Sequence, residues 1–154
     1  MTLAQLITII EGVAGSQPSV RSVIRNDVFR LNANPEAIYG VFAWLQGNHT
    51  DSLDTGMVTY SFTFFYVDRL TFDRSNEVEV QSVGIQTLHN ICKTLDSKGV
   101  YVATDISYQT FNQRFTDECA GVYCSVSLEV PIDSLCEEDF LDFSSDFSSD
   151  FTIY

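Results

Sequence analysis

The sequence predicts an α+β domain: a largely antiparallel sheet, one long helix packed across it and a further helix at the N-terminus. Residues 3–14 and 80–95 repeat apolar side chains every three or four positions, as amphipathic helices do. Residues 57–67 and 122–130 alternate apolar and polar side chains instead, as half-buried strands do. The order of helix, strands, helix and strands favours one sheet with the second helix lying across it.

The first half of the chain contains one helix and three expected strands. The apolar face of the N-terminal helix is Leu3, Leu6, Ile7, Ile10, Val13 and Ala14, and Gly15 is expected to end it before a loop at 16–19. Residues 28–31 are a short strand candidate, and a turn is expected at 32–35. Residues 38–45 are apolar on both faces, which favours a buried strand, although a helix fits the same run. Residues 47–56 are polar, so a loop is expected there before the strand at 57–67.

The second half is expected to hold the main helix and two strands. The helix should begin near Asp73, with Asp73 or Ser75 as its N-cap, and end at Gly99. Its predicted apolar stripe is Val80, Val83, Gly84, Leu88, Ile91, Cys92 and Leu95. A strand is expected at 100–108. The last strand should bury Val122, Cys124, Val126, Leu128 and Val130, and Gly121 before it permits a bulge or a close backbone approach. Phe62 and Leu88 are predicted core residues.

Charge divides the chain into a predicted domain at 1–131 and an acidic tail at 132–154. The 154 residues carry a net charge of −13, and seven acidic residues with no Lys or Arg follow Pro131. The tail therefore carries −7 and the rest of the chain −6. A groove that holds DNA needs basic residues to neutralise phosphates, so no tight nucleic-acid binding is expected.

Aromatic residues recur in this tail at spacings of 3, 4, 4 and 3: Phe140, Phe143, Phe147, Phe151 and Tyr154. Such spacing would place all five on one stripe of a helix, which suits docking into a groove of a partner. The alternative is a solvated acidic end that keeps the protein soluble.

The sequence contains none of the catalytic or metal-binding motifs that were sought. The four cysteines form no CxxC pair, neither histidine stands beside a cysteine, and the sequence has no nucleophile elbow or phosphate-binding glycine loop. Cys124 alternates with Val and Leu, so a core cysteine is expected, and His89 is expected on a helix surface or at an interface. We therefore expect no enzymatic activity, no cofactor and no metal. We also expect no membrane segment, because residues 3–13 are apolar but too short to span a bilayer.

One polar cluster joins the aromatic strand to the main helix. It contains the charged residues Asp68, Arg69, Asp73, Arg74 and Glu77. Because acids and arginines alternate here, we expect ion pairs rather than an acid–base pair. The segment is then either a helix cap with surface ion pairs, each worth about 0–1 kcal/mol, or a contact between subunits.

Residues 60–91 and 111–131 resemble the small neck and tail-completion proteins of tailed bacteriophages, including the crAss-like phages of gut Bacteroidales. The resemblance rests on an aromatic strand, the pattern DR-x4-RSNE at 68–77, a helix, a strand and the segment DECAGVY at 117–123. It covers about half of the chain together with a similar N-terminal helix and strand, and it leaves the tail out.

The resemblance implies a tail-terminator-like α+β fold and a non-enzymatic virion protein. Such a protein forms a ring in the head-to-tail connector between portal and tail, and DNA passes through that ring without tight binding. Closed cyclic symmetry is expected, twelvefold first and sixfold second, with the portal or adjacent neck and tail proteins as partners. A function of another class stays open: a soluble adaptor that recruits a partner through its acidic Asp-Phe tail.

Overall fold

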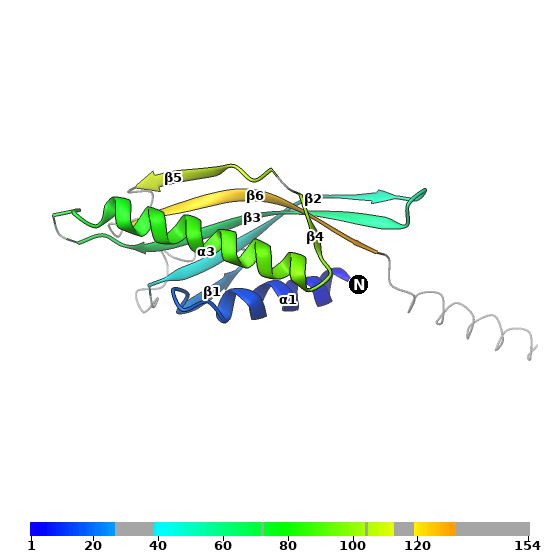
Figure 1. Ribbon diagram of the computed structural model, residues 1–154, viewed down its shortest axis with the longest axis horizontal. Coiled ribbons are helices and arrows are strands. Elements are labelled where there is room, and N and C mark those ends of the chain that lie inside the picture. The colour runs from blue at the N-terminus through cyan, green and yellow to red at the C-terminus, as the bar shows by residue number, and fades with distance from the viewer. Residues whose placement is uncertain (27–38, 72, 104, 113–118, 132–154) are drawn as a thin grey trace, which may run out of the picture.

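The computed structural model describes residues 1–26, 39–71, 73–103, 105–112 and 119–131. The elements follow in the order α1 (Leu3–Gly15), β1 (Ser22–Arg25), β2 (Val41–Ser52), β3 (Met57–Arg69), α3 (Glu77–Ser97), β4 (Tyr101–Val102), β5 (Tyr108–Asn112) and β6 (Cys119–Pro131). The strands form one six-stranded sheet in the order β1-β2-β3-β6-β4, with β5 also paired to β6. Only β1 and β2 run parallel among these pairs. The α+β prediction is confirmed, and Figure 1 shows α1 and α3 lying across the sheet. The strand expected at 28–31, the turn at 32–35 and the tail lie outside the described residues.

The centre of the sheet is the long antiparallel pair β3 and β6. The two strands stay in register from Met57 opposite Pro131 to Arg69 opposite Cys119. The predicted inward face of β6 is buried as expected, and so are Phe62, Phe64 and Tyr66 of β3. The rings pack edge to face with those of β2, with 5.2 Å between the centroids of Phe42 and Phe64. This aromatic layer forms the floor on which the helices pack.

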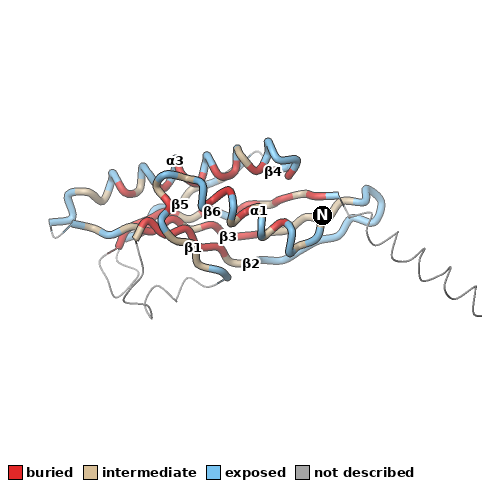
Figure 2. The backbone as a smooth tube through the Cα atoms, turned by 90° about the horizontal axis from the view of Figure 1, so that it is seen from below, coloured by how far each residue is buried: buried red, intermediate tan, exposed pale blue. Residues whose placement is uncertain are grey.

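Strand β2 is longer than the sequence indicated. Residues 47–56 were expected to form a loop, but the strand continues to Ser52, and the turn occupies the few residues before Met57. The pairing with β3 holds to the end, where Ser52 faces Met57, with one irregularity between Gln46 and His49. The loop prediction was wrong because strand pairing uses backbone groups, which polar residues supply as well as apolar ones. This half of the hairpin is exposed, so it needs no apolar face (Figure 2).

Helix α1 begins and ends where the sequence predicts. Thr2 and Gln5 form a capping box at its start, which satisfies free backbone N–H groups. Leu6, Ile10, Val13 and Ala14 are buried against the sheet and α3. The apolar spacing thus identified the helix and its buried face correctly.

Helix α3 begins at Glu77, later than expected, and its N-cap is Asn76 instead of Asp73 or Ser75. Most of the predicted stripe is buried, but Val83 is 37 % exposed, and Thr87 is buried in its place. Thr87 is tolerated there because its hydroxyl shares a 2.5 Å hydrogen bond with Ser19. A Cβ on Gly84 would lie 3.0 Å from both Tyr66 Cδ1 and Val122 Cγ2, so glycine lets the helix approach the sheet closely. The helix stops before Gly99, whose φ of +84° suits glycine.

The single strand expected at 100–108 is two strands that pair with different parts of β6. Val102 of β4 faces Leu128, whereas Tyr108 of β5 faces Cys124. After β4, the Ala103 amide donates a 3.1 Å hydrogen bond to the Ser127 carbonyl. The prediction of one strand was wrong because a run of apolar residues does not show where the chain separates from β6 and where it pairs with β6 again.

Candidate functional site

The turn from β3 to α3 holds the cluster in which the sequence predicts subunit contacts. Asp73 Oδ1 accepts hydrogen bonds from Thr71 Oγ1 at 2.8 Å and from the Ser75 backbone N and Oγ at 3.2 and 2.9 Å. These bonds, the one from Thr71 first, lower the pKa of the Asp73 carboxyl below its usual value. Arg74 follows with a φ of +58°. Asp73 therefore closes a turn ahead of the helix, which is why it does not cap α3.

Asn76 ties this turn back to the end of β3. Its Oδ1 accepts the Thr71 amide at 2.8 Å, and its Nδ2 donates to the Arg69 carbonyl at 3.1 Å. Sequence reasoning missed this residue, although an Asn directly before a helix is a common cap. The side chain of Asn76 makes no capping bond to α3, because its groups are used inside the turn.

The other charged residues of the cluster also have contacts within the subunit. Asp68 Oδ1 accepts the Arg69 amide at 2.8 Å, and the Arg69 guanidinium lies 4.5 Å from the centroid of the Tyr39 ring. Glu77 Oε1 accepts a 2.6 Å hydrogen bond from Asn112 Nδ2, which joins the start of α3 to β5. The structure thus brings the five predicted residues together in one turn region. Their role in contacts between subunits stays a prediction.

The middle of helix α3 and the whole of helix α1 carry very few charges. The α3 segment from Val80 to Cys92 contains no Asp, Glu, Lys or Arg. On the solvent side of α3, Val78 in the first turn is 77 % exposed, and Val83 and Ile85 are each 37 % exposed. A helix on the surface of a monomer usually carries its charges on this side. In a chain with a net charge of −13, such a surface is typical of one that another protein covers.

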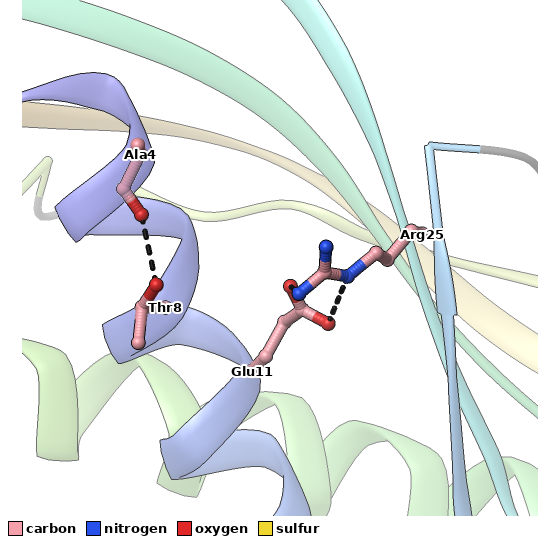
Figure 3. Close-up of polar contacts among 4 residues, drawn as sticks. All are labelled: Ala4, Thr8, Glu11 and Arg25. Carbon is pink, nitrogen blue, oxygen red and sulfur yellow. Dashed lines mark hydrogen bonds and ion pairs between the residues drawn. The ribbon is translucent and has the colours of Figure 1, made fainter.

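Helix α1 also carries very few charges. Its only charged side chain is Glu11, which binds Arg25 of β1 (Figure 3). Arg25 Nε donates to Glu11 Oε2 at 3.0 Å, and Nη2 lies 2.9 Å from Oε1 in an ion-pair contact that lacks hydrogen-bond geometry. The one acid of this face is thereby neutralised. The charge-free run in α3 and the single charge in α1 are both visible in the sequence. They indicate an uncharged outward surface, which the search for motifs did not predict.

An open groove lies along the first turns of α1, next to the end of β6. The described residues that line it are Met1, Ala4, Gln5, Thr8, Ile9 and Pro131, and its volume is about 760 Å³. The Met1 amine donates a 3.0 Å hydrogen bond to the Pro131 carbonyl, which holds the two chain segments side by side. Thr8 Oγ1 donates to the Ala4 carbonyl at 3.0 Å, so its hydroxyl is already satisfied within the helix (Figure 3). The described lining is therefore mainly apolar, and no charged side chain belongs to it.

Two thiols of the described chain, Cys92 and Cys124, are held in the protonated state. Cys92 and Cys124 are buried, and burial raises the pKa of each thiol to about 12. The expectation that Cys124 is a core residue is confirmed. His89 is exposed on α3, and His49 on the hairpin packs against Tyr60 with 5.0 Å between ring centroids. Within the described ranges, no group of three His, Cys, Asp or Glu side chains could hold a metal ion.

The predicted docking residues of the tail, Phe140, Phe143, Phe147, Phe151 and Tyr154, lie outside the part of the chain that the structure describes. None of the helices in the described part is long and apolar enough to cross a membrane. No family model matches the chain, and no curated protein is significantly similar to it.

Proposed function

We propose that this chain is a structural subunit that assembles with copies of itself into a ring. The observation that carries the proposal is the outward face of the helical layer, where α1 and the middle of α3, from Val80 to Cys92, present apolar and uncharged residues in place of the usual charges. Covering Val78 and Ile85 would remove apolar surface from water, which favours association.

The place of this ring in a virion follows from the resemblance to phage neck proteins. We propose that it belongs to the head-to-tail connector, between the portal and the tail, and that DNA passes through it. The portal is a closed ring, so a subunit that joins it should follow cyclic symmetry, with twelve copies as the first expectation and six as the second. The acidic character of the chain supports a conduit that does not hold DNA.

The direct test is the mass and symmetry of the full chain, alone and mixed with the portal of the same phage. Mass photometry and two-dimensional class averages should show a closed ring in at least one of the two samples. A monomer or dimer in both would contradict the proposal and favour the adaptor function.

A pair of variants tests the helical face itself. Val78→Glu with Ile85→Glu places two charges on it and should reduce the assembled fraction at least tenfold. Val78 is 77 % exposed and Ile85 is 37 % exposed, so the free energy of unfolding should fall by no more than about 2 kcal/mol. Thr50→Glu adds a charge at an exposed position of the hairpin and serves as the control. Unchanged assembly of the double variant would exclude this face as the contact.

A further inference from the structure

We propose that the groove along α1 receives the aromatic stripe of the tail, residues 140–154, from a neighbouring copy of this chain. The inference rests on the proposed function, because it requires copies of the chain to meet, and it names the contact that links one copy to the next.

The chemistry of the groove fits that of the tail stripe. The groove is open to solvent, and its volume of about 760 Å³ leaves room for aromatic side chains. Ala4 and Thr8 have short side chains on the outward surface of α1, and a Cβ on Gly12 would meet no atom within 4 Å. Aromatic rings spaced by three and four residues can therefore lie along this surface as an amphipathic helix lies in an apolar groove.

Charge also favours this occupant. The tail carries −7, so it is repelled from the acidic parts of the body. The described lining of the groove has no charged side chain, and Glu11 on the same helix is paired with Arg25.

The direction of the chain selects a neighbouring copy over the chain's own tail. Strand β6 runs toward the end of the molecule where α1 begins, and α1 runs back from that end (Figure 1). At Pro131 the chain runs opposite to α1, so its own tail would lie along α1 only after a reversal of direction, whereas the tail of a neighbouring copy needs none. One copy would then bind the next in a head-to-tail contact, which closes into a ring when the rotation allows it.

The first experiment measures tail binding without any need for ring formation. A fluorescent peptide of residues 132–154 is titrated into the full chain carrying Phe143→Ser and Phe147→Ser, whose own tail then competes poorly. Anisotropy should show saturable binding, and a peptide of the same composition with scrambled aromatic spacing should bind at least tenfold more weakly. Adding Ala4→Glu and Thr8→Glu to the protein should lower affinity at least tenfold, whereas Thr8→Gln, of equal length but uncharged, should lower it less than threefold. Failure of the peptide to bind, or equal binding to the Glu variant, would overturn the groove assignment.

The second experiment decides which copy supplies the tail. The full chain with Ala4→Glu and Thr8→Glu keeps its tail, and the full chain with Phe143→Ser and Phe147→Ser keeps its groove. Mixed together, they should form a one-to-one complex in mass photometry that neither forms alone. If the mixed complex forms but the unaltered chain stays monomeric at the same concentration, the tail fills the groove of its own chain and the proposal of a neighbouring copy is wrong.

The two proposals can fail separately. If the wild-type chain forms no ring while the peptide and mixing results hold, the ring is wrong and the groove contact stands. If rings form equally well in the chain with the altered tail, the ring stands and the tail is not the link between copies.

Discussion

Replacing Gly121 by Ala tests the closest backbone approach in the sheet. Gly121 of β6 lies between Val67 of β3 and Phe111 of β5. A Cβ at this position would overlap the carbonyl oxygen of Tyr66 and lie 2.8 Å from Phe111 Cζ. The ring of Phe111 can turn, but the Tyr66 oxygen belongs to the central strand and cannot move without disturbing its pairing. The sequence predicts a bulge or a close approach at this glycine, and the structure confirms the close approach.

The expected cost follows from this geometry. Extra methyl groups in a packed interior cost about 1–3 kcal/mol when side chains can adjust. Because a backbone atom blocks this one, we expect Gly121→Ala to lower the free energy of unfolding by about 3 kcal/mol or more. For a domain of this size, a change of that order lowers the melting temperature by roughly 10 °C.

Urea denaturation followed by circular dichroism measures this change, and Gly12→Ala is the matched control. Gly12 lies within α1, where a Cβ would meet no atom within 4 Å, so alanine should stabilise the protein by up to about 1 kcal/mol through its helix propensity. A loss of less than about 1 kcal/mol for Gly121→Ala, with the control behaving as expected, would refute the close approach of β6 to β3.

Three further outcomes are expected. Phe62→Ala and Leu88→Ala should each lower the free energy of unfolding by about 2–5 kcal/mol, because these side chains are 1 % and 0 % exposed. A loss of less than about 1 kcal/mol for both variants in urea denaturation would contradict the packing. Cys92 and Cys124 have thiol pKa values raised from 9.0 to about 12 by burial, so unfolding exposes groups that ionise more easily. The contribution of the two thiols to stability is therefore complete below pH 9 and is lost as the pH rises toward 12. The urea midpoint should fall between pH 8 and 11, and it should fall less when Cys92 and Cys124 are both changed to Ala. Finally, the acidic chain should show no salt-sensitive binding to duplex DNA in an anisotropy titration, and tight binding would contradict a conduit that lets DNA slide.

The sequence alone determined the elements whose side chains repeat with a clear period. Helix α1, strand β3, strand β6 and the buried stripe of α3 were predicted because each buries one face, and burial imposes the period of the backbone on the apolar residues. Phe62 and Cys124 could be placed in the core for the same reason. Glycine also carried information, since Gly99 and Gly121 both stand where a side chain would be strained or would collide.

Tertiary contacts decided everything that depends on backbone pairing or on polar groups with several possible partners. The outer half of β2 is a strand because β3 pairs with it, although its residues are polar and exposed. Asp73 could have capped α3, but Thr71 and Ser75 bind it first, and the helix begins later. Thr87 replaces Val83 in the core because Ser19 lies within hydrogen-bonding distance. The groove that joins α1 to the end of β6 was likewise invisible in the sequence, since Ala4 and Pro131 meet only when the sheet brings the end of β6 to the start of α1.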